Sequence, residues 1–126
     1  INPLPIQRPI PIWMGAGGPG VPVGPNRVLR RVGRLADGYF PLCEAGDTAR
    51  TLIETVKRYA QEAGRNPDDL KIEGRIELTG TPEDWKTQLI AWEDLGADLV
   101  SIGTARAPFH TPHEHIQAIK TFKEII

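Results

Sequence analysis

The sequence predicts an α/β protein built from four βα units with parallel strands. Short apolar runs and amphipathic stretches alternate strictly along the 126 residues, a pattern typical of parallel strands joined by right-handed helical crossovers. Good N-cap residues open the amphipathic stretches, and glycines close most of them. The chain is one domain by length, well short of the roughly 250 residues typical of a complete (β/α)₈ barrel.

Composition narrows the class of protein. The 40% hydrophobic and 25% charged fractions are those of an ordinary globular domain, and a net charge of −1 gives no electrostatic reason to expect nucleic acid. A single cysteine excludes an internal disulfide framework and fits a reducing cytoplasm. No leader or long apolar run is present, so we expect a cytoplasmic protein without a membrane partner. Because the sequence opens at Ile1, we interpret it as a fragment of something longer.

The first unit begins with a proline-rich lead-in over residues 1–9. The apolar run 10–14 predicts a strand, which ends in the glycine-rich stretch 15–20 (GAGGPG). Glycine lets a backbone turn tightly or approach a ligand closely. The loop then continues to residue 25, so the sequence predicts a strand that runs into a loop rich in free backbone groups.

A helix follows this loop. Asn26 is a residue type favoured at the N-cap, and the next ten residues carry one apolar face: Val28, Leu29, Val32, Leu35 and Ala36. Gly38 is predicted to stop the helix, and residues 39–42 form a second short strand. The first two strands and their connecting helix thus occupy residues 10–41.

Residues 47–79 are predicted to hold a helix and a third strand. Asp47 is the expected N-cap, helical spacing of apolar residues continues to Ala63, and Gly64 ends the helix. Turn residues fill 65–69. From Lys71 the pattern changes to strict alternation, with Ile72, Gly74, Ile76 and Leu78 on one face and Glu73, Arg75 and Glu77 on the other.

Residues 81–126 complete the alternation. Thr81 and Pro82 start a helix whose apolar stripe is Trp85, Leu89, Trp92 and Leu95, and Gly96 ends it. Residues 99–103 form the fourth strand. After the loop 104–110, Thr111 and Pro112 start a last helix, expected to turn Ile116, Ile119, Phe122 and Ile126 inward.

Four phrases of the sequence resemble one family. Residues 9–15 (PIPIWMG), 31–41 (RVGRLADGYFP), 62–67 (EAGRNP) and 94–100 (DLGADLV) are similar, in order and spacing, to the carboxyl-terminal half of the bacterial luciferase-like oxidoreductases. That family includes monooxygenases and oxidoreductases that use FMN or the deazaflavin coenzyme of the F-420 type in a (β/α)₈ barrel. The resemblance covers nearly the whole chain, but the first four strands of the barrel have no counterpart here.

The resemblance implies a single half-barrel domain over residues 1–126, the carboxyl-terminal half of the barrel. It implies FMN or the F-420-type deazaflavin as the cofactor and no metal. A half barrel leaves open strand edges and an uncovered apolar interior. We therefore expect it to bind either its missing amino-terminal half or a second copy of itself. The substrate is not identified by the sequence.

In barrels of this kind, chemistry takes place beyond the carboxyl ends of the strands, here residues 15–18, 41–44, 79–80 and 103–106. Gly15, Ala16, Gly17 and Gly18 are predicted to hold the cofactor phosphate with backbone amides, helped by Asn26 and Arg27 at the helix start. The alternative is a connection whose glycines only permit turns. Arg106 follows the fourth strand, where a guanidinium group can bind phosphate or carboxylate; the alternative is an arginine of a surface loop.

Other candidate residues have simpler interpretations. Arg27, Arg30, Arg31 and Arg34 share a helical face, which we interpret as solvated except at Arg27. His113 and His115 diverge on a helix and no cysteine partner accompanies them, so we predict no metal site. Cys43 is expected to behave as a small, partly buried apolar residue, and Trp13 is the one tryptophan that ends a strand.

Two functions of different class follow. The first is a fragment or subunit of a flavin- or deazaflavin-dependent oxidoreductase that supplies the cofactor-phosphate side of the site and is inactive alone. The second is a non-catalytic half-barrel scaffold or interaction module. The charged row Glu73, Arg75 and Glu77 separates them, because it must line a polar interior, form ion pairs or face water.

Overall fold

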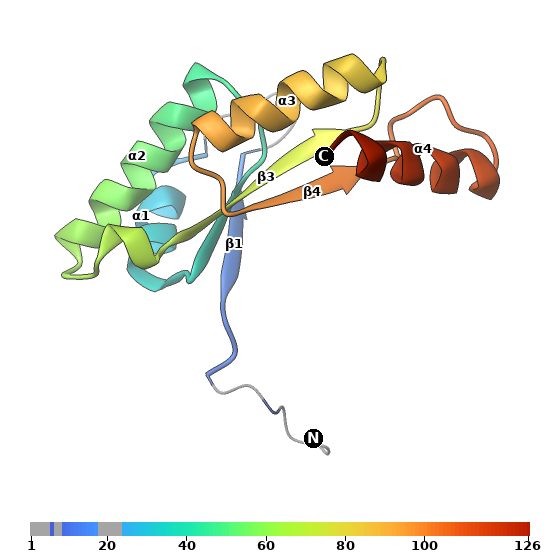
Figure 1. Cartoon of the computed structure of the whole chain (residues 1–126). Coiled ribbons are helices and arrows are strands. Elements are labelled where there is room, and N and C mark those ends of the chain that lie inside the picture. Colours follow the sequence, from blue (N-terminus) through green and yellow to red (C-terminus); the bar gives the residue numbers. More distant parts are fainter. Residues whose placement is uncertain (1–5, 7–8, 18–23) are drawn as a thin grey trace.

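The computed structural model describes residues 6, 9–17 and 24–126. Four parallel strands form one sheet in the order β1-β2-β3-β4, and a helix follows each strand (Figure 1). The predicted four βα units are thereby confirmed. The elements are β1 Trp13–Ala16, α1 Asn26–Leu35, β2 Gly38–Pro41, α2 Asp47–Glu62, the 3₁₀ turn η1 Pro67–Asp69, β3 Lys71–Glu77, α3 Pro82–Asp94, β4 Leu99–Gly103 and α4 Pro112–Ile125.

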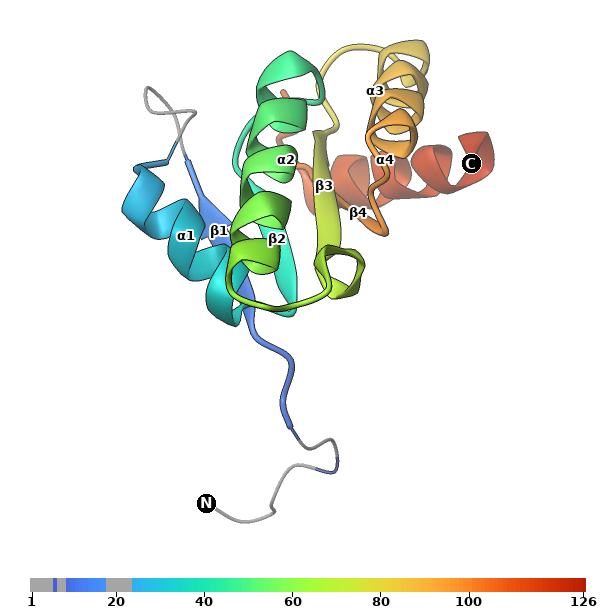
Figure 2. The ribbon, with the colours of Figure 1, turned by 90° about the vertical axis from the view of Figure 1, so that its left-hand side faces the viewer.

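The alternation in β3 separates the two faces of the sheet. Ile72, Gly74 and Ile76 are buried, whereas Arg75 is exposed and Glu73 and Glu77 are half-buried. The buried row faces the helices, since the Trp92 indole of α3 lies against Gly74. We call this the outer face of the sheet and the opposite one, with Arg75, the inner face. Figure 2 shows α1 and α2 lying along the strands on the outer side.

Helices α1 and α2 approach each other closely at Gly33. A Cβ at this position would lie 2.6 Å from the carbonyl oxygen of Val56, so only glycine permits the observed distance. Arg65 joins the same region from the turn after α2. Its Nη1 donates to the carbonyl of Gly33 (2.8 Å) and its Nη2 to that of Ala36 (2.7 Å). These bonds satisfy carbonyls at the end of α1 that have no partner within the helix.

Several predicted helix ends are confirmed. Thr81 and Thr111 each form a capping box, in which the threonine hydroxyl accepts from an amide three residues on and a carboxylate returns the bond. Gly64 and Gly96, at φ of 76° and 74°, come immediately after Ala63 and Leu95, the C-cap residues of α2 and α3. A left-handed backbone is accessible to glycine at little cost, so these positions end their helices as expected.

Three predicted boundaries of the first units are wrong. The residue that caps α1 is Pro25, not Asn26, and Gly46, not Asp47, caps α2. Asn26 and Asp47 are instead the first residues of their helices. Gly38 does not stop α1, which already ends at Leu35; it lies in β2, where a Cβ would collide with the indole of Trp13. Glycine is therefore needed at position 38 because the Trp13 ring packs against it on the inner face, and not because a helix ends there.

The first strand lies further along the chain than the predicted 10–14. It pairs with β2 over Trp13–Ala16, so Gly15 and Ala16 belong to the strand and not to the loop. Upstream, Pro9 and Pro11 have no amide hydrogen to donate to a ladder. Ile12 is held instead by Asp37, because its amide donates to Oδ2 of that residue at 2.8 Å.

Four residues predicted to face inward are exposed: Leu35 at 54%, Ile116 at 51%, Ile119 at 44% and Ile126 at 70%. In α4 the buried positions are Ala118 and Phe122, which lie one turn apart and leave Ile116 and Ile119 to the side. Among the described residues, no helix has both the length and the apolar character needed to cross a membrane.

Candidate functional site

A cavity of about 620 Å³ opens at the carboxyl ends of the strands, where β2 and β3 part. The pairing of these strands is short: it consists of Gly38↔Lys71 and Tyr39↔Ile72. Beyond Tyr39 the chain of β2 leads away toward α2, while β3 continues beside β4 to Glu77↔Gly103. The unpaired stretch between them becomes one side of the cavity.

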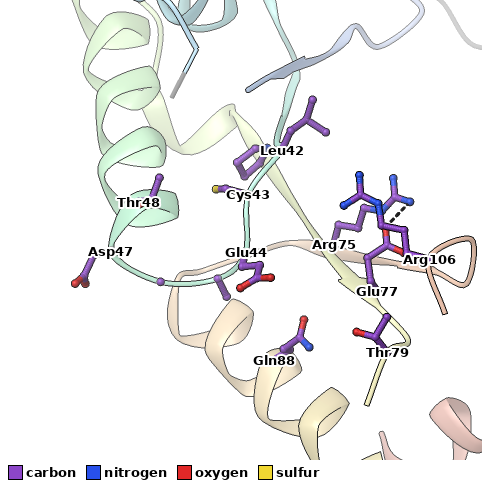
Figure 3. A pocket seen from close by; sticks show the side chains of 13 residues that line it. Leu42, Cys43, Glu44, Asp47, Thr48, Arg75, Glu77, Thr79, Gln88 and Arg106 are labelled. Atoms are coloured by element: carbon purple, nitrogen blue, oxygen red, sulfur yellow. Dashed lines mark ion pairs between the residues drawn. The ribbon is translucent and has the colours of Figure 1, made fainter. Parts of the chain in front are cut away.

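The lining comes from β2, β3 and the segments that follow β2, β3 and β4, and from helices α2 and α3. Figure 3 shows side chains that follow β2, others from β3 and its end, and single residues from α3 and from the loop after β4. The full set is Pro41, Leu42, Cys43, Glu44, Ala45, Gly46, Asp47, Thr48, Arg75, Glu77, Thr79, Gln88 and Arg106. Residues 41–44, Thr79 and Arg106 are among those that the sequence placed beyond the strand ends.

An ion pair occupies the inner face of β3 at the cavity. Arg75 Nη2 lies 2.7 Å from Glu77 Oε1, and their side chains are 42% and 22% exposed. The pair extends over Gly103 of β4, where a Cβ would lie 2.5 Å from Glu77 Oε2 and 2.8 Å from Arg75 Nη2. The sequence left three arrangements open for the charged row: a polar interior, ion pairs or contact with water. Arg75 and Glu77 form an ion pair.

Cys43 enters the cavity wall as a half-buried residue packed against the core. Burial raises the pKa of its thiol, and the neighbouring carboxylate of Glu44 raises it further. A thiol with a raised pKa stays protonated near neutral pH and is a poor nucleophile. Burial, followed by the influence of Cys43, also raises the pKa of Tyr39. Cys43 therefore lines the cavity without supplying an ionised nucleophile, and Tyr39 is a fully buried residue of the core.

The predicted glycine-rich site lies at the carboxyl end of β1, away from the cavity between β2 and β3. Gly17 follows β1 with a φ of 105°, which favours glycine. Gly24 returns beside it: a Cβ on Gly24 would lie 3.0 Å from Ala16 Cβ and 3.4 Å from the Gly17 nitrogen. The two ends of the loop thus meet next to the start of α1. Gly18, the remaining glycine predicted for this site, lies outside the described residues.

Asn26 and Arg27 lie at the start of α1 and are exposed. With Arg30, Arg31, Arg34 and Leu35 they border a second cavity of about 480 Å³. Its lining has no residue in common with the cavity that contains Arg106. The structure therefore places Asn26 and Arg27 together at the start of α1. Arg106 lies apart from them, in the cavity at the ends of β2 and β3.

The histidine-rich segment has a structural role. Glu114 accepts hydrogen bonds from the amides of His110 and Thr111, both at 2.7 Å, and so closes the cap of α4. The ring of His115 packs edge-on against Phe109 at 5.3 Å. Within residues 6, 9–17 and 24–126, no group of three metal-binding side chains comes together. The predicted absence of a metal stays a prediction.

Sequence reasoning missed part of the cavity. Thr48 and Gln88 line it from α2 and α3, and neither belongs to a motif that marks a site. Their place depends on how the helices dock. Arg75 and Glu77 did carry a signal, since a charged row on a strand covered by helices must face a polar interior or form ion pairs.

Comparison with known proteins identifies a family. The model of a family described as luciferase-like monooxygenase matches residues 1–76, which include the glycine-rich segment, α2 and most of β3. No curated protein sequence gives a significant match to the chain.

Solved structures with the same fold are larger than this chain. A coenzyme F-420-dependent tetrahydromethanopterin reductase from Methanopyrus kandleri superposes with a TM-score of 0.67 at 12% identity, over 93% of this chain and 50% of the reductase. A rubisco-like protein from Burkholderia fungorum gives 0.52 at 14% identity, over 91% and 28%. The chain thus spans about half the length of the first structure, and at these identities the likeness concerns the fold.

Proposed function

The chain belongs to the luciferase-like monooxygenase family, and on that premise we propose that it supplies the cofactor-phosphate side of the site in a flavin- or deazaflavin-dependent oxidoreductase. One observation carries the proposal: the strand end at Gly17, the returning Gly24 and the start of α1 converge on one small region. Gly17 permits the left-handed backbone there, Gly24 permits the close approach of the returning chain, and the first amides of a helix have no partner within the helix.

These residues suit a phosphate group. The proposed donors are the backbone amides of Gly15, Ala16, Gly17 and Gly18 and those of Asn26 and Arg27, because the amides of Val28 and Leu29 already donate to the carbonyl of Pro25. The positive end of the helix dipole favours an anion. Asn26 and Arg27 add a side-chain amide and a fixed positive charge. The chain's own contribution is to bind and orient the cofactor.

The cofactor, FMN or the F-420-type deazaflavin, supplies the hydride chemistry when it is bound. In the complete barrel that we propose, the other half supplies the contacts to the redox ring, so this chain holds only part of the contacts to the cofactor. The partner that completes the site is either an amino-terminal barrel half or a second copy of the chain. The 126 residues alone are expected to show no oxidoreductase turnover.

The chain alone should bind the cofactor weakly, with contacts limited to the phosphate group. Two or three charge-assisted hydrogen bonds, each worth roughly 1.5 to 3 kcal/mol, must offset an association cost of at least about 4 kcal/mol. We therefore expect FMN and the deazaflavin to bind with a Kd no better than about 1 mM.

The test is a titration of the ¹⁵N-labelled chain with each cofactor, followed by the amide resonances of Gly15, Gly17 and Asn26. These resonances should shift when the cofactor is added. Gly17→Val should abolish the shifts, while the other resonances of the variant keep the dispersion of a folded protein. Gly96→Ala, a glycine substitution far from the loop, is the matched control. Micromolar binding with a quenched flavin ring would show that the site is complete without another half and would end the half-site proposal.

A further inference from the structure

Arg75 and Arg106 bring two guanidinium groups to one cavity from neighbouring strands. Arg75 lies on the inner face of β3, and Arg106 lies three residues beyond the last residue of β4, Gly103. Both line the 620 Å³ cavity, and Figure 3 shows them at the same wall. The cavity volume falls within the range of roughly 300 to 1,000 Å³ typical of small-molecule sites.

Glu77 fixes the position of Arg75. The 2.7 Å ion pair uses one edge of the guanidinium group, whereas arginine has five N–H donors. The absence of a side chain on Gly103 lets the pair extend over β4, on the side from which Arg106 follows. Arg75 is therefore oriented and still retains donors for a ligand, which lowers the entropy lost on binding.

The charges of the cavity are distributed unevenly. Arg106 forms no ion pair within the described part of the chain. Arg75, Arg106 and Glu77 together carry a formal charge of +1, whereas the complete lining, which also includes Glu44 and Asp47, carries −1. The other acidic residues, Glu44 and Asp47, follow β2 across the cavity, and Figure 3 shows the Asp47 carboxylate directed away from the arginines. An anionic group would be attracted to the arginine wall.

We propose that Arg75 and Arg106 bind the oxyanion of a substrate, a carboxylate or a phosphate, and that Glu77 is the positioning residue for Arg75. This oxyanion site is separate from the predicted phosphate site, because Gly15, Ala16, Gly17, Asn26 and Arg27 do not line the cavity that contains Arg75 and Arg106. The assignment to substrate, and not to the phosphate of the cofactor, rests on the proposed function above.

The experiment uses the 126-residue chain with two probes, inorganic phosphate and succinate. Side-chain Nε–H resonances of Arg75 and Arg106 and the amide of Thr79 report on binding. Both probes should shift these signals, and Arg106→Gln or Arg75→Gln should weaken binding about tenfold, the loss of one charge-assisted contact. Arg34→Gln removes an exposed arginine of α1 outside this cavity and should leave binding at these signals unchanged.

The role of Glu77 has its own readout. Glu77→Gln should move the Nε–H signal of Arg75 in the free protein and weaken binding of both probes. In the Arg75→Gln background the same substitution should have no further effect, because a positioning residue acts only through the group that it positions. An equal loss in both backgrounds would overturn this part of the proposal.

Further outcomes separate this proposal from the glycine-loop proposal. Gly17→Val should leave the shifts at Arg75 and Arg106 intact, whatever it does to cofactor binding. If neither probe shifts either guanidinium signal, the oxyanion site is refuted. If FMN shifts Arg106 and Arg106→Gln weakens FMN binding, the arginines serve the cofactor, and the assignment to substrate is refuted while the cofactor proposal survives.

Discussion

The indole of Trp92 lies against Gly74, on the face of β3 opposite to that of Arg75. A Cβ on Gly74 would come within 2.5 Å of the ring atom Cδ2, and the indole Nε1 donates to the carbonyl of Arg75 at 3.1 Å. Trp92 is fully buried. The contact that docks α3 on the outer face thus fixes the backbone from which Arg75 and Glu77 extend on the inner face.

Gly74→Ala should destabilise the protein by about 1 to 3 kcal/mol, because the new methyl group would overlap a buried ring that cannot move freely. Gly103→Ala is the matched control on the neighbouring strand. Its Cβ would meet only the ends of the Arg75 and Glu77 side chains, which can swing toward solvent, so stability should change by less than about 0.5 kcal/mol. Urea unfolding measures both, and equal losses would contradict the packing described.

Gly33→Ala tests the close approach of α1 and α2. Its Cβ would lie 2.6 Å from the Val56 oxygen and 2.7 Å from the Ala60 nitrogen, both backbone atoms. Since backbone cannot swing aside, the helices must separate, and we expect a loss of about 1 to 3 kcal/mol in the free energy of unfolding. Arg34→Ala, at the adjacent exposed position, should stay within about 0.5 kcal/mol of the unsubstituted protein.

Arg65→Ala should cost about 1.5 to 3 kcal/mol, because it removes two hydrogen bonds from a charged group to the carbonyls of Gly33 and Ala36. Arg65→Lys should recover only part of this loss, since an ammonium group does not present the two parallel donors of a guanidinium. Thermal unfolding measures both variants. If Arg65→Lys were as stable as the unsubstituted protein, the positive charge, and not the paired donors of the guanidinium group, would stabilise the end of α1.

Stability should fall below about pH 4 partly through Asp98. Burial, the largest single influence, acts to raise the pKa of this carboxyl, but hydrogen bonds from Lys71 and the Ile72 amide outweigh it and the pKa is lowered. A lowered folded-state pKa means that the contribution is present above the unfolded-state pKa and is lost as pH falls through the folded-state value.

Asp98→Asn should therefore destabilise the protein more at about pH 6 than at about pH 3, because the contribution of the charged carboxyl decreases as the pH falls toward its folded-state pKa. Glu93→Gln, which removes the charge of an exposed carboxyl group on α3, is the control substitution. Urea unfolding at the two pH values gives the comparison. An equal effect of Asp98→Asn at both would contradict the assigned bonds.

The chain should associate when no other barrel half is present. Within the described residues, β1 and β4 each pair on one side only. Large apolar side chains are exposed near both ends of the sheet: Ile10, Ile12 and Trp13 beside β1, and Leu99, Ile116 and Ile119 on β4 and α4. Exposed strand edges and apolar patches favour association, so sedimentation should show at least a dimer.

Ile119→Glu should shift the chain toward monomer without unfolding it, because Ile119 is already 44% exposed. Leu35→Glu, at an exposed apolar position on α1, is the control and should leave the assembly unchanged. A monomer for the unsubstituted chain at every concentration tested would contradict the prediction.

Much of the fold is predictable because its signals are local. The period of two in β3 identifies the strand and its buried row, and the threonine caps of α3 and α4 and the glycines after α2 and α3 mark helix ends within four residues of sequence. Hydrogen bonds that span a single turn form wherever the right residues are adjacent. The sequence by itself therefore determined the order and type of the elements.

The tertiary structure decided what depends on distant partners. Gly38 looks like a helix stop until Trp13, 25 residues earlier, lies over it, and the extent of β1 follows from its pairing with β2. The cavity exists because β2 separates from β3 after Tyr39, and Arg75, Gln88 and Arg106 meet there only once strands and helices have docked. Register and packing angle are collective properties of the chain, so no local window of sequence specifies them.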